Sequence, residues 1–128
     1  MKTKLLTIDQ WNNIKKDSET DEPAIEGDSC VLIGGVAFLV QRKNEWNNVI
    51  CFRVKDSKYS ILQTFCTFRA WCEKQSIQYF RVQGNGKHTY KMLYLVCRIG
   101  QKEGKECDVL YDYNKSNDKQ HFYLVKAY

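Results

Sequence analysis

The apolar residues of this chain gather in short runs that polar turn residues separate, a pattern typical of β-strands. The first long run covers residues 30–42 and is rich in β-branched and aromatic residues. It contains Gly34 and Gly35, a pair that suits a bulge, a bend or a tight turn better than a helix. Asparagine-rich turn residues follow, and residues 49–54 are again apolar. We therefore predict two strands, 30–42 and 49–54, that pair as a hairpin.

The spacing of the apolar residues becomes that of a helix in residues 57–75. Apolar side chains recur there at positions i, i+4, i+7 and i+11, which are Ile61, Phe65, Phe68 and Cys72. Either Ser57 or Ser60 can cap the start of this helix, and Ser60 with Gln63 forms a capping-box pattern. We predict that this is the main helix of the protein and that it packs on one face of a sheet.

The amino-terminal segment, residues 1–16, predicts a second, shorter helix that docks on the rest of the fold. Thr7 or Asp9 can cap it, and the apolar residues that would share its inner face are Ile8, Trp11 and Ile14. Residues 17–29 contain the single proline and several acidic residues but few apolar ones. This composition is typical of an acidic linker or surface loop, so we expect this segment to join its neighbours without packing.

The second half of the chain predicts four more strands, at residues 76–83, 89–99, 107–113 and 121–127. The run at 89–99 is apolar on both alternating faces, which places it in the middle of a sheet. It follows GNGK, in which Asn85 and Gly86 carry a strong hairpin signal because both residue types tolerate a positive φ. We therefore expect a central hairpin formed by the first two of these strands.

Together these elements predict a single α+β domain over residues 1–128. Its sheet has five or six strands and is largely antiparallel or mixed, because strands and helices do not alternate as they do in a doubly wound parallel sheet. The helix at 57–75 covers one face. The other apolar face needs a cover too, which either the amino-terminal helix, through Trp11 and Ile14, or another subunit can supply. A homodimer is therefore one expectation.

Composition narrows the class of protein further. Of the 128 residues, 43% are hydrophobic and 27% are charged, as in an ordinary globular protein. No apolar run approaches the roughly 20 residues that cross a bilayer, and the amino terminus has no signal-peptide core. We therefore expect no membrane association and a cytoplasmic location. The six cysteines lie mostly within apolar runs, which favours buried free thiols over disulfides.

The stretch QGNGKHTYK, residues 83–91, is the part of the chain most similar to a phosphate-binding loop. A Walker-type loop needs G-x-x-x-x-G-K-[ST], but here Arg81 stands at the first glycine position and His88 follows the lysine. We therefore favour a turn. The closest cysteine pair, Cys66 and Cys72, is spaced more widely than the ligands of structural zinc. We predict no catalytic residue, no metal site and no cofactor.

Aromatic and basic residues interleave across the predicted central hairpin. The candidate binding residues are Tyr79, Arg81, Lys87, His88, Tyr90, Lys91 and Tyr94. On the surface of a sheet, such side chains can stack on bases and neutralise phosphates, or they can be core aromatics flanked by lysines that reach the solvent. The net charge of +5 permits a nucleic-acid partner without requiring one.

Three successive predicted elements, the strand VICFRV, the helix ILQTFCTFRAWCEKQ and the strand SIQYFRVQ, resemble the central unit of GNAT-type acyltransferases, over about residues 48 to 83. In that family the signature Q/R-x-x-G-x-G/A lies at the start of the helix, where its amides hold the pyrophosphate of acetyl-CoA. This sequence has KDSKYSILQTF at that place, without a glycine. The resemblance implies a helix at TYKMLYLV, closing strands at CDVLYDY and HFYLVKAY, and a degenerate acetyl-CoA site.

These observations predict a small non-catalytic binding or regulatory protein. It would recognise a protein or a nucleic acid through the aromatic and basic sheet surface. The abundance of lysine, asparagine and tyrosine is typical of AT-rich genomes, viral genomes among them. The alternative, which rests on the resemblance, is a GNAT-like acyltransferase with a degenerate acetyl-CoA site.

Overall fold

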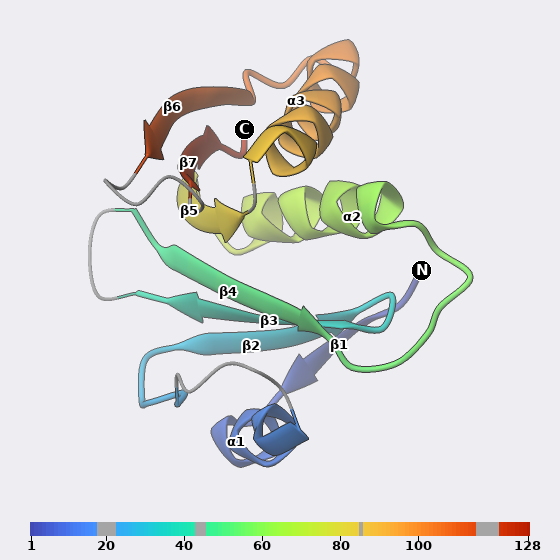
Figure 1. Cartoon of the computed structure of the whole chain (residues 1–128), viewed down its shortest axis with the longest axis vertical. Coiled ribbons are helices and arrows are strands. Elements are labelled where there is room, and N and C mark those ends of the chain that lie inside the picture. The colour runs from blue at the N-terminus through green and yellow to red at the C-terminus, as the bar shows by residue number, and fades with distance from the viewer. Residues whose placement is uncertain (18–22, 43–45, 85, 115–120) are drawn as a thin grey trace.

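The described part of the chain forms one mixed β-sheet with helices on both faces (Figure 1). This computed structural model describes residues 1–17, 23–42, 46–84, 86–114 and 121–128. In chain order, the helices and strands are β1 (Thr3–Leu6), α1 (Ile8–Ile14), β2 (Ser29–Ile33), β3 (Val36–Gln41), β4 (Asn48–Arg53), α2 (Ile61–Lys74), β5 (Tyr79–Gly84), α3 (Gly86–Lys102), β6 (Asp108–Asn114) and β7 (His121–Lys126).

The order of strands in the sheet is β1-β2-β3-β4-β5-β7-β6. Neighbouring strands are antiparallel except for β4 and β5, which are parallel. The predicted α+β class and mixed sheet are thus confirmed. The predicted count of five or six strands is too low, because the described residues contribute seven. One strand that the sequence did not reveal is β1, which is only four residues long.

The run at residues 30–42 was predicted as one strand and is in fact two. Gly34 and Gly35 both have a positive φ, +55° and +79°, and reverse the chain between β2 and β3. The carbonyl of Gly35 also accepts hydrogen bonds from the amides of Val54 (2.7 Å) and Lys55 (3.3 Å). The turn therefore holds the chain where it leaves β4. The predicted pairing of the next two strands is confirmed, since β3 and β4 are antiparallel.

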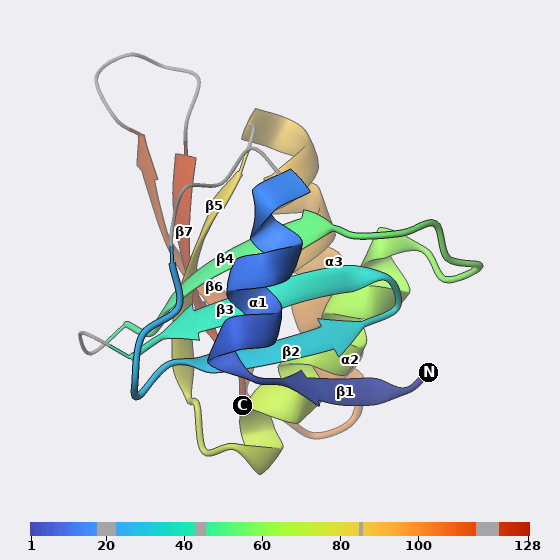
Figure 2. The same cartoon turned by 90° about the horizontal axis from the view of Figure 1, so that it is seen from below.

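The amino-terminal helix docks as predicted, although α1 and the 3₁₀ turn that follows it begin only after β1. The cap is Thr7 rather than Asp9. Figure 2 looks onto α1, which lies across β2, β3 and β4. On its inner face Trp11 is 0% exposed, and its ring lies 5.1 Å from that of Phe52. The amino-terminal helix therefore covers the part of this face that β2, β3 and β4 form.

Within the predicted linker, residues 17–29, the structure describes residue 17 and residues 23–29. Its described part packs, contrary to expectation, because Ala24 is buried beside Trp11. The side chain of Asn12 accepts from the amide of Ala24 at 3.0 Å and donates to its carbonyl at 3.4 Å. Ser29 already belongs to β2. The acidic segment therefore returns the chain from α1 to the sheet through specific contacts.

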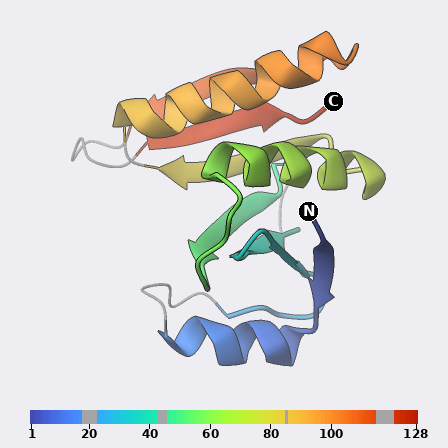
Figure 3. The same cartoon turned by 90° about the vertical axis from the view of Figure 1, so that its right-hand side faces the viewer.

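The main helix is confirmed, with Ser60 as its cap and Gln63 completing the capping box. Its inner face carries the aromatic centre of the core, where Phe68 stacks on Phe38 at 4.3 Å between ring centroids. Both α2 and α3 lie on the face of the sheet opposite α1 (Figure 3). The core on this side contains residues of β2, β3, β4, β5 and β7.

The predicted central hairpin is wrong, because residues 89–99 belong to helix α3. Gly86 begins this helix, and Asn85 lies outside the described residues. β5 pairs with β4 and β7 instead. The apolar positions of this run form two stripes at helical spacing, of which one is buried and one faces solvent. An alternating pattern of apolar residues does not by itself distinguish such a helix from a strand that is apolar on both faces. The two closing strands, β6 and β7, were predicted correctly and are antiparallel.

The six cysteines are free thiols, as predicted, and four of them are buried. Cys51 and Cys66 are partly exposed. Burial raises the pKa of Cys30 to about 11 and that of Cys51 to about 12. These thiols are therefore neutral at physiological pH. None of the helices in the described residues is long and apolar enough to cross a membrane.

Candidate functional site

A cleft opens where β4 and β5 separate. The two parallel strands pair over only two residue pairs, Asn48 with Arg81 and Val49 with Val82. Beyond them β4 stays paired with β3, and β5 stays paired with β7. The space between the diverging strands is a cleft of about 760 Å³. The residues that line it are Asn48, Val49, Ile50, Cys51, Arg81, Gln83, Gly84, His88, Thr89 and Phe122.

Asparagine side chains fix the closed end of this cleft. Nδ2 of Asn47 donates to the carbonyl of Tyr79 at 3.0 Å, and the carbonyl of Asn47 accepts from the amide of Arg81. Oδ1 of Asn48 accepts from Nε of Arg81 at 3.3 Å. A positive φ of 46° at Asn47, which asparagine tolerates better than most residues, makes this arrangement possible. The hydrogen bonds from Asn47 and Asn48 to β5 therefore fix the point at which the two strands separate.

Arg81 is the one lysine or arginine among the described residues that line the cleft. The guanidinium of Arg81 lies over the ring of Phe122, 4.9 Å from its centroid. Among the described residues that line the cleft there is no Asp or Glu, and the described ion pairs do not include Arg81. A cation that has no carboxylate partner among the described residues favours a ligand that brings a carbonyl oxygen or an anionic group.

Two lining residues bear on possible chemistry. Cys51 is not a ready nucleophile, because burial raises its pKa to about 12 and the thiolate is the reactive form. His88 lies on the first turn of α3 and is exposed. Histidine is the residue type best suited to proton transfer near neutral pH. The cleft therefore offers one acid–base group, one cation and several amide groups.

The wall between Gly84 and α3 is tight. A Cβ atom at Gly84 would lie 2.3 Å from the side chain of Thr89. Only glycine lets the last residue of β5 approach the first turn of the helix this closely. The contact sets the position of His88 relative to the strand. Gly84, two residues before the start of α3, was the signal in the sequence that could have indicated this packing.

The start of α2 lies on the same side of the molecule as the cleft. Figure 3 shows the carboxyl ends of β4 and β5 and the first turns of α2 and α3 together on that side. Two backbone amides at the start of α2, those of the cap residue Ser60 and of Gln63, already have partners: Gln63 Oε1 accepts from Ser60 N–H at 2.8 Å, and Ser60 Oγ accepts from Gln63 N–H at 3.1 Å. Lys55 and Lys58, in the segment before the helix, are exposed. Both lysine side chains are therefore available to contact an anion here.

The structure divides the predicted binding residues into two groups. Tyr79 and Arg81 lie on β5, and Arg81 lines the cleft together with His88. Tyr90, Lys91 and Tyr94 lie on the exposed side of α3. The side chain of Lys87 is not described. The residues do not share one sheet surface, because the hairpin that would have joined them does not exist. Cleft residues that sequence reasoning missed include Asn48, Thr89 and Phe122.

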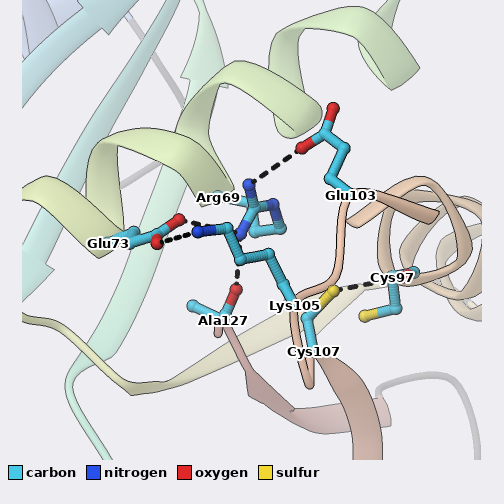
Figure 4. Close-up of polar contacts among 7 residues, drawn as sticks. All are labelled: Arg69, Glu73, Cys97, Glu103, Lys105, Cys107 and Ala127. Carbon is cyan, nitrogen blue, oxygen red and sulfur yellow. Dashed lines mark hydrogen bonds and ion pairs between the residues drawn. The ribbon is translucent and has the colours of Figure 1, made fainter. Parts of the chain in front are cut away.

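A buried arginine fixes α2 against the carboxyl end of α3 (Figure 4). Arg69 is 4% exposed and donates from Nη1 to the carbonyl of Ala127 at 2.8 Å. It also pairs with Glu73 (3.5 Å) and with Glu103 (3.7 Å). A hydrogen bond from Lys105 lowers the pKa of Glu73. This cluster joins α2 to the segment that follows α3 and to the chain after β7.

Comparison of the chain with protein-family models, with curated proteins and with solved structures finds no match. In the described part of the chain, no group of three or more His, Cys, Asp and Glu side chains is placed to hold a metal ion. The chemistry of the cleft is therefore the basis for a functional proposal.

Proposed function

We propose that this chain is a binding protein of GNAT-like arrangement whose β4–β5 cleft holds acyl-coenzyme A or a related pantetheine-bearing ligand. The observation that carries the proposal is the separation of two parallel strands after two residue pairs, around a cleft of about 760 Å³. That volume lies within the usual range of small-molecule sites. Ligands in open α/β sheets bind outside the carboxyl ends of parallel strands, where this cleft opens.

The order of elements supports the proposal. The resemblance to GNAT-type acyltransferases implies a strand, a helix, a strand, a second helix and two closing strands. The structure has β4, α2, β5, α3, β6 and β7 in that sequence. In particular, residues 89–96 are helical, as the resemblance implies.

The edges of the cleft suit an extended ligand that carries amides. Past Val49, β4 keeps its ladder with β3 only, so its other edge faces the cleft. Such an edge offers backbone N–H and C=O groups to a ligand that lies along it like a strand. The pantetheine arm is a thin chain with two amide groups. Arg81, at the closed end, can donate to the carbonyl oxygen of an attached acyl group.

The phosphates would be held differently from those of the family. The family's glycine-rich signature is absent, and the capping box of Ser60 and Gln63 occupies two of the amides at the start of α2. Lys55 and Lys58 are the cations next to that helix. We expect these lysines to contact the phosphates from the side, which makes binding more sensitive to salt than an amide cradle would. We assign no catalytic residue on this basis.

Calorimetric titration and thermal unfolding with acetyl-CoA test the proposal. At a hundred times the Kd, a ligand stabilises the native state by about 2.7 kcal/mol, which raises the Tm of a domain of this size by about 5–15 °C. The variant Arg81→Gln should lose most of this shift. The matched control Arg98→Gln, which is exposed on α3 and is not among the residues that line the cleft, should keep it. Pantetheine alone should compete with acetyl-CoA.

Two results would refute the proposal. One is the absence of any shift at millimolar acetyl-CoA. The other is a shift that is the same in Arg81→Gln and Arg98→Gln, which would place the ligand outside the cleft.

A second candidate function is acyl transfer in the same cleft, and it is favoured by the presence of His88. The histidine would take a proton from the amine as the amine nitrogen bonds to the thioester carbonyl carbon. The carbon–sulfur bond then breaks, and coenzyme A leaves as a thiol that carries this proton. Acetyl-CoA and a mixture of polyamines should then release free thiol, and His88→Ala should stop the release without loss of acetyl-CoA binding. If acetyl-CoA binds but no free thiol is released, the result supports the binding function and refutes acyl transfer.

A further inference from the structure

The solvent side of α3 is unusually apolar for an exposed helix. Four large hydrophobic side chains there are about two-fifths exposed: Tyr90 (44%), Tyr94 (44%), Leu95 (38%) and Ile99 (39%). The opposite side of the helix is buried through Leu93, Val96 and Cys97. A surface helix normally carries one apolar stripe, toward the core. The second stripe on α3 therefore has no explanation within the described fold.

The charges on α3 are all of one sign. The helix has no Asp or Glu, and its described basic side chains Lys91, Arg98 and Lys102 are exposed. At about 3.6 residues per turn, these three positions fall on one narrow strip along the helix. The two tyrosines flank this strip on one side. Leu95 and Ile99 flank it on the other. The exposed face is thus a central row of cations between an aromatic edge and an aliphatic edge.

The aromatic edge is already ordered by contacts within the protein. The rings of Tyr90 and Tyr94 stack with 6.3 Å between centroids and an interplanar angle of 19°. The guanidinium of Arg98 lies 5.9 Å from the centroid of Tyr94, and Tyr90 lies 6.0 Å from Tyr123. Side chains held in this way lose less conformational entropy when a partner binds.

We propose that this face of α3 docks an acidic amphipathic helix of a protein partner. A helix with a row of Glu or Asp between two rows of apolar residues is its complement in both charge and apolar pattern. A second copy of this chain does not fit, because α3 against α3 would place the two cationic rows together. Nucleic acid would use the cations and the tyrosines but would leave Leu95 and Ile99 without a role. The inference is independent of the ligand in the cleft.

Fluorescence anisotropy at low salt tests the docking surface with a labelled synthetic helix. The probe has Glu in a central row and Leu on both flanks. A peptide of the same composition in scrambled order is its control, and an oligothymidine of about 20 nucleotides tests the nucleic-acid reading. We expect the amphipathic peptide to bind and the scrambled peptide to bind at least about tenfold more weakly, since only the first can place both apolar rows.

Substitutions identify the surface. Leu95→Glu should weaken peptide binding at least about tenfold, because it places a carboxylate against the acidic row and removes an apolar contact. The matched control is Leu110→Glu on β6, which is 48% exposed and changes the net charge equally. Arg98→Gln should weaken binding and reduce its salt dependence. Far-ultraviolet circular dichroism and the Tm confirm that each variant is folded.

Three results would overturn the proposal. These are no peptide binding at low salt, equal binding of the two peptides, and equal effects of Leu95→Glu and Leu110→Glu. Oligothymidine that binds more tightly than the peptide, without sensitivity to Leu95→Glu, would assign the face to nucleic acid instead.

Discussion

Replacing Arg69 with methionine is expected to lower the free energy of unfolding by about 2–4 kcal/mol. Arg69 is buried, and its guanidinium is the donor to the carbonyl of Ala127, a residue that is itself 0% exposed. Methionine keeps much of the apolar volume of the arginine stem but cannot donate a hydrogen bond. The substitution therefore isolates the polar contribution of the side chain.

The magnitude follows from the three contacts of the guanidinium. A buried carbonyl left without its donor costs about 1–3 kcal/mol. The ion pairs contribute less, because the side chains of Glu73 and Glu103 are 31% and 60% exposed and solvent screens them. Such pairs are worth about 0–1 kcal/mol each. Glu73 also keeps Lys105 as a partner, so its charge is not left alone.

Urea unfolding followed by tryptophan fluorescence measures the change, with Trp71 on α2 as a nearby buried reporter. Glu103→Gln is the matched control, since it removes only the more exposed ion pair and should cost less than about 1 kcal/mol. Arg69→Met that is as stable as the wild type, or more stable, would refute the reasoning. It would mean that the desolvation of the guanidinium outweighs its hydrogen bond and its ion pairs.

Three further predictions concern local conformation and protonation. The variant Gly35→Ala should lower the free energy of unfolding in urea by at least about 2 kcal/mol, because Gly35 has a φ of +79° and a Cβ there would overlap the carbonyl of Lys55. The control Gly27→Ala should lower it by about 1 kcal/mol, because no atom lies within 4 Å of a Cβ at Gly27. Equal losses in the two variants would contradict the steric explanation. The variant Ser60→Ala should lower the free energy of unfolding by about 1 kcal/mol, and Ser60→Gly should lower it by only about a few tenths of a kcal/mol. A larger loss in Ser60→Gly than in Ser60→Ala would exclude the capping role. Cys51 should react with iodoacetamide at pH 8 about a thousandfold more slowly than a free thiol, as followed by mass spectrometry, because its folded pKa is about 12. Since thiols of the unfolded chain ionise first, the free energy of unfolding should also fall as the pH rises above about 8.5, and a pH-independent value would contradict the raised pKa.

The sequence by itself determined the two helices that carry local signals. The capping box of Ser60 and Gln63, and the apolar spacing that runs from Ile61 to Cys72, located α2. Thr7 and Trp11 did the same for α1. Capping and helical spacing act within one or two turns, so a short window of sequence contains the interactions that decide them. The turn residues between the strands are local signals too, because each turn depends on only a few consecutive residues.

The identity of α3 was decided by tertiary structure. Residues 89–99 are apolar at alternating positions and also at helical spacing, so the local pattern satisfied both predictions. Packing of Leu93, Val96 and Cys97 into the core selects the helix, and it leaves the second apolar stripe on the surface. The binding residues that the hairpin would have gathered were consequently divided between the cleft and the outer face of α3.

The cleft depends entirely on tertiary structure. Asn48 and Arg81 meet across 33 positions of sequence, and the strands they belong to separate after the next residue pair. No local pattern encodes where a parallel ladder ends, because its length depends on what α2, β3 and β7 impose on the two strands from outside. The sequence determined which residues prefer strands and helices. The three-dimensional packing determined which of their edges are left open to a ligand.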